Sequence, residues 1–376
     1  MSRRAVASLA VAETVSWGIL YYAYGVLIPF LERDLDASKA AVSGAFSVAL
    51  LAAAGVAGPA GRGLDRWGTR RVMTLGSVVG ASALAILAGA TRLWHLYASL
   101  IFVGVAHAAV LYEPAFTAIA RWFSSPAPRT RALLVVTSCA GLASTLFLPL
   151  TAFLCVRHGW RATVLVLAAG LAVVTIPLHA SLPRDGAGGR PARGRGGGGL
   201  ALLSALQAFV SAGVTVHLVA FLDGAGHGLA GAAAIAGLLG AAQVPGRLLF
   251  APLSRWRRAR LSLLLGVQAL ALVGIVATPG LIVVPVALFG AANGMFTLER
   301  ATLVAERFPA GEHGAVNGRI ATLSLLARAA APFAVALLAG AASFAVAFAA
   351  LAAILLGAAV RSRGLRFAIR GRATSR

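Results

Sequence analysis

The chain has 376 residues, of which 59% are hydrophobic and 12% are charged, and its formal net charge is +22. Soluble domains carry about 25% charged residues, so this is not the composition of a water-soluble globular protein. The two cysteines, Cys139 and Cys155, both stand in apolar surroundings, which argues against a disulfide framework and against a cysteine-based metal cluster.

Long apolar runs separated by arginine, glycine and proline predict twelve membrane-spanning helices. A helix needs about 20 apolar residues to cross a bilayer, so twelve runs fill the chain and leave short loops. The predicted spans lie near residues 5–31, 40–61, 71–91, 94–121, 131–155, 161–182, 199–222, 229–252, 261–279, 281–305, 314–338 and 341–361. The spacings Gly76-x-x-x-Gly80 and Gly290-x-x-x-Gly294 predict close helix packing. We therefore expect an all-α integral membrane protein.

Basic residues are dense in every second loop. With the N-terminus inside, 24 of the 33 Lys and Arg residues fall on the cytoplasmic side and five on the outer side, which predicts that both termini are cytoplasmic. The net charge is then a signal of topology and of contact with anionic lipid, and not of nucleic-acid binding. Only Lys39 is a lysine. Abundant arginine, alanine and glycine are typical of a GC-rich bacterial genome, which predicts a bacterial inner (plasma) membrane.

The spans divide into two halves of six. The Gly- and Arg-rich segment 183–198 has no apolar pattern and is expected to be a cytoplasmic linker. It joins a predicted bundle at 1–182 to a second at 199–361, and a basic tail occupies 362–376. A shift of 185 residues aligns Gly61-Arg62 with Gly246-Arg247 and produces two further matches at equivalent places. Such a repeat is typical of transporters with duplicated halves.

The loop between the second and third predicted spans reads Gly61-Arg62-Gly63-Leu64-Asp65-Arg66-Trp67-Gly68-Thr69-Arg70-Arg71. This segment resembles the cytoplasmic signature of the major facilitator superfamily. The resemblance implies two pseudo-symmetric six-helix bundles that alternate access to a central site. We expect Asp65 to pair with nearby arginines and, with Arg66, Arg70 and Arg71, to gate the cytoplasmic side.

Shorter motifs indicate a narrower relationship. The segments Tyr21-Tyr22-Ala23-Tyr24-Gly25-Val26, Tyr112-Glu113-Pro114 and Gly159-Trp160-Arg161 are similar to those of bacterial monocarboxylate and oxalate–formate type transporters. This resemblance covers most of the N-terminal half and little of the C-terminal half. It implies a small organic anion, such as a monocarboxylate, as the substrate.

Arg328 is predicted near the middle of the eleventh span, on one helical face with Asn317 and Ser324. A guanidinium at this depth can hold a carboxylate by two parallel hydrogen bonds. Arg328 and Ser324 are therefore candidate substrate-binding residues. The alternative is a structural ion pair between Arg328 and a buried acid such as Glu13 or Glu299.

The first span carries a stripe of Glu13, Trp17, Tyr21 and Tyr24 on one side, with Tyr22 directed away from it. Trp17 and Tyr21 are candidate substrate contacts, and ordinary packing is the alternative for both. Glu13 lies toward the cytoplasmic end of the span, where gating, ion pairing and proton coupling are all open.

The fourth span holds two titratable candidates. His107 is a candidate substrate contact that can titrate near neutral pH, or a neutral imidazole that joins two helices. Glu113 is a candidate proton carrier, or the partner of an arginine on the cytoplasmic side, and Pro114 is expected to bend the helix beside it. Further candidate substrate contacts are Gln207 and Ser211 in the seventh span and Asn293 in the tenth.

The sequence contains no phosphate-binding loop and no recognisable catalytic constellation, so we expect no enzyme activity, no cofactor and no metal site. It predicts a monomeric secondary active transporter that moves a small solute on a proton or solute gradient. Two alternatives stay open: an efflux carrier for apolar or cationic compounds, and a sensor with a transporter fold that moves nothing.

Overall fold

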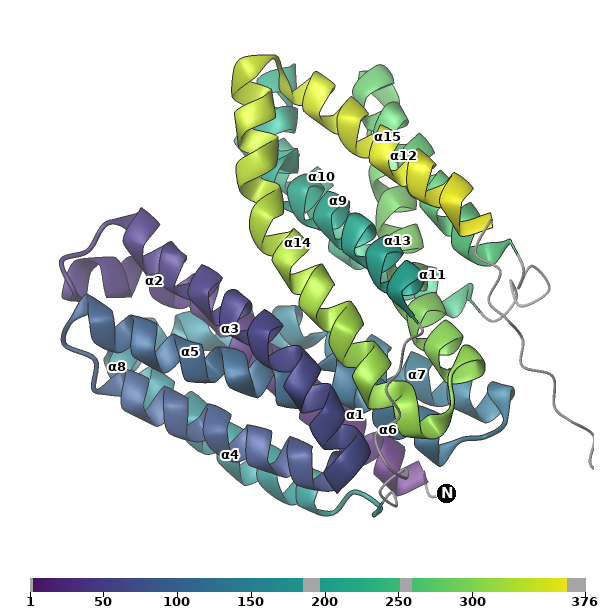
Figure 1. The fold of residues 1–376 in the computed structure, drawn as a ribbon. Coiled ribbons are helices and arrows are strands. Elements are labelled where there is room, and N and C mark those ends of the chain that lie inside the picture. The colour runs from purple at the N-terminus through teal and green to yellow at the C-terminus, as the bar shows by residue number, and fades with distance from the viewer. Residues whose placement is uncertain (1–2, 185–196, 251–258, 364–376) are drawn as a thin grey trace, which may run out of the picture. The chain divides into compact units, whose positions relative to one another are not determined.

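The computed structural model describes residues 3–184, 197–250 and 259–363, and these residues are almost entirely helical (Figure 1). Most of the predicted linker at 183–198 and of the predicted tail at 362–376 lies outside the described residues.

The helices that precede the predicted linker include one π-helical turn, η1. They are α1 (Arg3–Trp17), η1 (Gly18–Tyr22), α2 (Ala23–Asp34), α3 (Lys39–Trp67), α4 (Thr69–Ala88), α5 (Leu93–Val110), α6 (Tyr112–Trp122), α7 (Pro126–Gly141) and α8 (Ala143–Ala180). The later ones are α9 (Gly198–Leu222), η2 (Asp223–His227), α10 (Gly228–Ala241), α11 (Gln243–Leu248), α12 (Arg260–Ala277), η4 (Pro279–Leu281), α13 (Val283–Arg307), η5 (Ala310–Glu312), α14 (His313–Ala341) and α15 (Phe344–Arg363).

Nine helical stretches in the described part of the chain are long and apolar enough to cross a membrane. One of them, Pro126–Ala180, contains the fifth predicted span and all but the last two residues of the sixth. The two are separable because Gly159 has a φ of 77°, which interrupts the helical path within α8. The eighth and tenth predicted spans are not among the nine stretches, so these apolar helices alone do not establish a count of twelve.

The chain forms two compact units. Unit 1 comprises Met1–Ala212 and Ala310–Phe333, and unit 2 comprises Gly213–Pro309 and Ala334–Arg376. The first part of α14 therefore belongs to the same unit as α1 to α8. The division into bundles at 1–182 and 199–361 stays a prediction.

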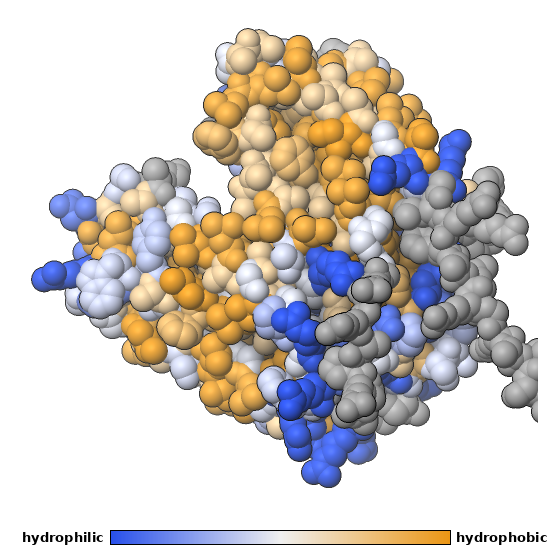
Figure 2. Space-filling model, viewed as in Figure 1, coloured by the Kyte–Doolittle hydropathy of each residue, from blue (hydrophilic) through white to orange (hydrophobic). Residues whose placement is uncertain are grey.

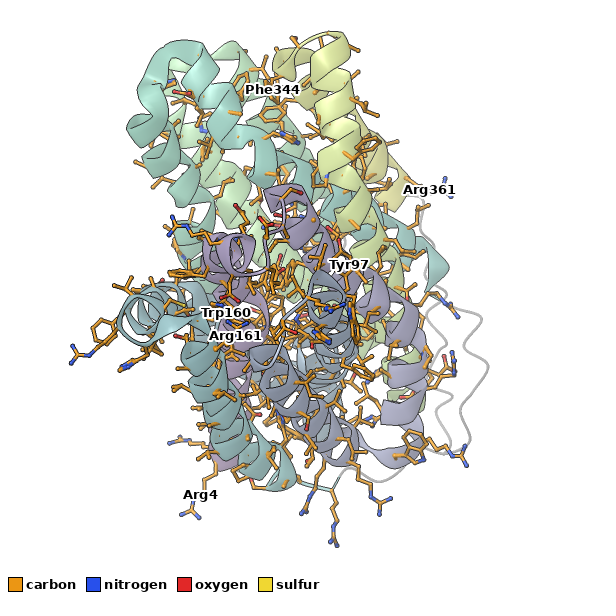
Figure 3. The ribbon with its side chains drawn as sticks, turned by 90° about the vertical axis from the view of Figure 1, so that its left-hand side faces the viewer. Arg4, Tyr97, Trp160, Arg161, Phe344 and Arg361 are labelled. Carbon is orange, nitrogen blue, oxygen red and sulfur yellow. The ribbon has the colours of Figure 1, made fainter. Side chains whose placement is uncertain are left out.

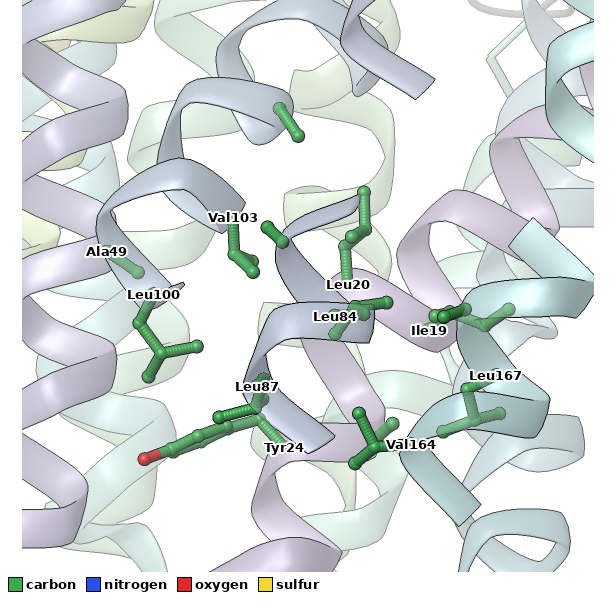
Figure 4. Packing of buried hydrophobic residues seen from close by; sticks show 14 of the residues in the cluster. Ile19, Leu20, Tyr24, Ala49, Leu84, Leu87, Leu100, Val103, Val164 and Leu167 are labelled. Carbon is green, nitrogen blue, oxygen red and sulfur yellow. The ribbon is translucent and has the colours of Figure 1, made fainter. Parts of the chain in front are cut away.

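Unit 1 has a continuous apolar core between η1, α2, α4, α5 and α8. Figure 4 shows the interlocking side chains, which include Leu20, Tyr24, Leu84, Leu87, Leu100, Val103, Val164 and Leu167. Gly76 lets α4 approach α5 closely, because a Cβ at this position would overlap Ala109 and Val110. The close packing predicted from the Gly76-x-x-x-Gly80 spacing is confirmed.

Unit 2 is also held together by glycines. Gly290 and Gly294 bring α13 against the backbones of Leu239 and Gln243, where no larger residue fits. This confirms the close packing predicted from their spacing. In the same unit, Phe221 of α9 packs on Phe348 of α15 with ring centroids 5.0 Å apart.

The sides of the helices are apolar on the outside as well as in the core. In the space-filling view, hydrophobic residues cover the helix flanks, and hydrophilic residues gather where helices end (Figure 2). Ile86 and Val173, for example, are 65% and 74% exposed. Surfaces of this kind are stable when lipid covers them, as in a membrane-spanning bundle.

Trp160 and Arg161 of the Gly159-Trp160-Arg161 motif lie next to each other on α8 of unit 1 (Figure 3). The guanidinium of Arg161 lies 2.6 Å from the carboxylate of Asp34 and donates to the Ala90 carbonyl at 2.7 Å. It also lies 4.4 Å from the ring centroid of Trp160. The motif therefore has a structural use in joining α2, α4 and α8.

Candidate functional site

Asp65, at the end of α3, is the centre of a buried polar cluster in unit 1. Its carboxylate accepts a hydrogen bond from the guanidinium of Arg121 at 2.6 Å. It also accepts the backbone N–H groups of Gly314 at 2.9 Å and Ala315 at 2.8 Å. These two residues open α14, so the carboxylate caps the positive end of that helix. We call Asp65, Arg121, Gly314 and Ala315 the Asp65 cluster.

Arg121 completes the Asp65 cluster from α6. It donates to the carbonyl of Leu64 at 2.8 Å and to that of Ala310 at 3.4 Å. One guanidinium thus joins the ends of α3 and α6 to the turn before α14. The planar guanidinium of arginine favours such sets of hydrogen bonds to several oxygen atoms at once.

Glycine makes this junction possible. A Cβ on Gly314 would overlap the Gly61 carbonyl and the Asp65 carboxylate, and a Cβ on Gly61 would overlap the Gly314 carbonyl. One turn further, a Cβ on Gly318 would overlap the carbonyl of Ala57. Helices α3 and α14 therefore touch backbone to backbone.

The arginines next to Asp65 in the sequence are not the ones that bind it. Arg66 and Arg71 are exposed, and Arg70 is half-buried. The expectation that Asp65 pairs with an arginine is confirmed, but its partner Arg121 comes from another helix. The signal in the sequence was the Arg121 that follows Tyr112-Glu113-Pro114 at the end of the same predicted span.

Arg328 is exposed and stands at the middle of α14, as its sixteenth residue of 29. The two acids considered as its structural partners are engaged otherwise or lie unpaired. Glu299 forms an ion pair with Arg260 at 2.5 Å, and Glu13 lies beside Trp17 and Glu113, with no ion pair among the described residues. The alternative of a structural ion pair with either acid is therefore not found in the described part of the chain.

The two residues predicted to share a face with Arg328 are buried in unit 1. Asn317 donates to the hydroxyl of Thr117 on α6 at 3.1 Å, and the Ser324 hydroxyl is buried with no hydrogen-bond partner among the described residues. Asn317 therefore sets the register of α14 against α6, while Arg328 remains open.

Five half-buried rings form the aromatic cluster of unit 1, which is made of Trp17, Tyr21, Tyr22, Phe46 and Tyr112. Trp17 lies 5.2 Å from Tyr21, 6.3 Å from Tyr22 and 4.9 Å from Tyr112, centroid to centroid. Tyr21 is also 5.3 Å from Phe46. The structure thus brings the candidate contacts Trp17 and Tyr21 together.

The first predicted span is not a regular α-helix. Gly18–Tyr22 form a π-helical turn in which the Ala23 N–H bonds to the Gly18 carbonyl, and the extra residue rotates the rest of the helix. Tyr22 joins the aromatic cluster, so the prediction that it points away was wrong. Tyr24 instead is buried, stacks on Phe46 and donates to the Val42 carbonyl at 2.6 Å.

His107 lies against the π-helical turn. Its Nε2 is 2.9 Å from the carbonyl of Leu20, and its side chain is 5% exposed. Because a carbonyl only accepts, Nε2 carries the proton. The contact favours the interpretation that His107 joins two helices. The helix breaks just beyond it at Leu111, whose ψ is −161°, three residues before Pro114, as expected from the proline.

Glu13 is completely buried on α1, one turn before Trp17. Glu113 at the start of α6 is half-buried and lies close enough to Glu13 to interact with it electrostatically. The two candidate acids are thus neighbours in unit 1.

The remaining candidates lie elsewhere in the fold. Gln207 and Ser211 of α9 are buried in unit 1, at 4% and 6% exposure. Asn293 of α13 is half-buried in unit 2.

Comparison with known proteins agrees with this helical architecture. Residues 10–332 match the model of the Major Facilitator Superfamily. Monocarboxylate transporter 11 of Mus musculus is 33% identical over 168 residues, which are 44% of this chain. The match spans only 36% of that relative's length.

Two solved structures share the fold. The crystal structure of the human organic anion transporter MFSD10 (TETRAN) has a TM-score of 0.77 and 19% identity, over 96% of this chain and 99% of that one. The proton:xylose symporter XylE has a TM-score of 0.77 and 13% identity, over 96% and 95%. The family match covers most of the residues that build both units. This multi-pass membrane protein therefore belongs to the Major Facilitator Superfamily of transporters.

Proposed function

We propose that the protein is a secondary active transporter that carries a small organic anion, most simply a carboxylate, by alternating access. The observation that supports it best is the exposed guanidinium of Arg328 at the middle of α14. An arginine at the centre of a membrane helix costs at least about 2.5–3.5 kcal/mol and is retained where it faces water or a ligand. Its planar fork matches a carboxylate.

The contacts of α14 support a similar depth in the membrane for Arg328 and for His107, which lies against the first predicted span. Asn317 contacts Thr117, and α6 and α14 run antiparallel in the predicted topology. Arg328 lies eleven residues beyond Asn317, and His107 lies ten residues before Thr117. At about 1.5 Å per residue, Arg328 and His107 stand at a similar depth.

We assign the energy coupling to Glu13. An ionised carboxylate that is completely buried without a cationic partner is strongly disfavoured, and Glu13 also lies beside the carboxyl group of Glu113, so its side chain in this state is expected to hold a proton. Exposure of Glu13 to the other side of the membrane during transport would release the proton. A proton gradient can thereby drive transport of the substrate across the membrane.

The Asp65 cluster is proposed as the gate. Its carboxylate joins α3 to the first turn of α14 through hydrogen bonds that a small displacement of either helix breaks. Arg66, Arg70 and Arg71 stay proposed as flanking charges of the gate. We further propose a bacterial inner membrane, with both termini in the cytoplasm, from the distribution of arginine in the sequence.

A carrier for cationic or apolar compounds is the second candidate. It is favoured by one observation, the position of Trp17 one turn after the buried Glu13. A carboxylate beside aromatic rings is an arrangement that can hold a lipophilic cation.

Thermal stabilisation of the detergent-purified protein separates the two candidates. A ligand at 100 times its dissociation constant adds about 2.7 kcal/mol to the folded state, so binding is measurable. We expect small carboxylates to stabilise the protein and Arg328→Gln to abolish the effect. Arg361→Gln, which removes an exposed arginine at the end of α15, is the matched control. Stabilisation by lipophilic cations alone would contradict the anion proposal.

A further inference from the structure

Two tyrosines of the first predicted span differ in how they are packed. Tyr24 is 5% exposed, and its hydroxyl is satisfied by the Val42 carbonyl. Tyr21 is half-buried, and its hydroxyl has no hydrogen-bond partner in the part of the chain that the structure describes. Tyr24 is therefore a packing residue, whereas Tyr21 presents an open polar edge.

Trp17 packs directly against Tyr21. Its indole Nε1 is inaccessible to solvent, and Glu13, one turn earlier, lies close enough to this N–H to interact with it. Trp17 and Tyr21 are in edge-to-face contact, with an interplanar angle of 61°. The open hydroxyl of Tyr21 therefore lies at the edge of a packed aromatic pair.

The backbone is adapted to build this cluster. Adjacent residues on a regular α-helix point about 100° apart, yet Tyr21 and Tyr22 both contact Trp17. The π-helical turn Gly18–Tyr22 makes this possible. Single π-turns inside α-helices are frequent at functional sites.

The aromatic cluster and Arg328 are at a similar depth along the helices of unit 1. Tyr21 lies 6.2 Å from His107, centroid to centroid, and His107 stands at the depth of Arg328 by the register of α14 on α6. Unit 1 thus offers a cation and a set of half-buried rings at one level of the membrane. A ligand that uses both has a negatively charged end and a flat apolar body.

We propose that the aromatic cluster is a binding subsite for the body of the substrate, and that the substrate is an aryl carboxylate rather than a short aliphatic acid. This inference rests on the proposed function, because it assigns the carboxylate to Arg328. The ring of the substrate packs on Tyr21 and Trp17 in offset or edge-to-face geometry, which favours an aromatic ring over a saturated one of similar size.

The test compares four probes on the full-length protein in detergent: benzoate, cyclohexanecarboxylate, propionate and benzylamine. Dissociation constants are measured by calorimetry for the wild type and for Tyr21→Leu, Tyr21→Phe and Tyr24→Phe. Tyr24→Phe is the matched control, because it removes the hydroxyl of a packing tyrosine three residues along the chain.

We expect benzoate to bind the wild type about 3- to 10-fold more tightly than cyclohexanecarboxylate, which is the size of an aromatic pair contact. Tyr21→Leu removes this preference and leaves propionate binding within about 2-fold. Tyr21→Phe and Tyr24→Phe keep the preference, because both retain an aromatic ring at position 21. If Tyr21→Leu does not fold, Trp17→Leu is the second variant, and it should also weaken the preference for benzoate, because it removes the other ring of the subsite.

Four results would overturn the inference, and they differ in what else they remove. Equal binding of benzoate and cyclohexanecarboxylate, or a preference that survives in Tyr21→Leu, removes the aromatic subsite and leaves the anion transporter standing. Binding of benzylamine without any carboxylate removes both proposals and favours the cation carrier. If Tyr24→Phe loses the preference for benzoate as fully as Tyr21→Leu does, the preference depends on how the protein packs and not on a ring contact at Tyr21.

Discussion

The carboxylate of Asp65 lies 2.6 Å from the guanidinium of Arg121, and these side chains are 1% and 6% exposed. Both charges are thus withdrawn from water, and each relies on the other and on backbone groups for solvation. Removing one member of a buried pair leaves an uncompensated charge, which costs far more than the pair contributes.

Asp65→Asn is expected to lower the free energy of unfolding by about 3–5 kcal/mol, because Arg121 loses its counter-charge and α14 loses its cap. Thermal unfolding of the purified protein measures the effect. Arg62→Gln, on an exposed arginine of the same helix, should change it by no more than about 0.5 kcal/mol. Equal effects of the two substitutions would contradict a special role for the buried carboxylate.

Gly314→Ala should destabilise the protein by about 1–3 kcal/mol, because the added Cβ overlaps the Gly61 carbonyl and the Asp65 carboxylate. Gly340→Ala is the control on the same helix, since a Cβ there meets open space, and it should be neutral or stabilising by up to about 1 kcal/mol. A neutral Gly314→Ala would show that α3 and α14 are not in backbone contact.

Arg328→Lys tests whether the proposed anion site uses the fork of the guanidinium or only its charge. Lysine keeps the charge and loses the two parallel donors, so we expect carboxylate binding to weaken by about tenfold, equivalent to about 1.4 kcal/mol. Calorimetry with propionate measures it. Wild-type affinity in Arg328→Lys would mean that the site senses charge alone.

Glu13→Gln is expected to keep the fold and to abolish proton-driven accumulation. Glutamine has the shape of the protonated acid and carries no proton to release, so exchange of substrate across proteoliposomes should continue while a pH gradient no longer drives uptake. Glu32→Gln, near the end of α2, is the control for loss of an acid. Gradient-driven uptake in Glu13→Gln would place the coupling elsewhere.

The ion pair of Arg260 and Glu299 in unit 2 should behave as a structural element. Its carboxylate and guanidinium are buried, and the guanidinium lies 4.2 Å from the ring centroid of Phe250. Glu299→Gln alone should cost about 3–5 kcal/mol, whereas the double replacement Arg260→Met with Glu299→Leu should restore most of it. Transport by the stable double variant would confirm the structural role, and loss of transport would contradict it.

Several features were predictable because they depend on neighbouring residues. The apolar spans arise from about 20 consecutive side chains, and the break before Pro114 arises from a missing N–H. The close packing at Gly76 and Gly290 depends on spacing along one helix. The loop around Asp65 identified the family, and its acid does bind an arginine.

Other features depend on which distant segments meet. Asp65 has four arginines within six residues, yet Arg121 binds it from 56 positions away, because packing of α6 on α3 buries that arginine and leaves Arg66 and Arg71 exposed. Glu299 is satisfied by Arg260, and that choice depends on how α12 lies on α13.

The sequence by itself thus determined the membrane class, the helical architecture and the family, because hydrophobicity and loop motifs are local properties of the chain. Only the tertiary structure decided the partner of Asp65, the π-helical turn that gathers Tyr21 and Tyr22, and the exposure of Arg328. Ion pairs, helix register and solvent access arise from contacts between residues far apart in the sequence, and periodicity carries no information about them.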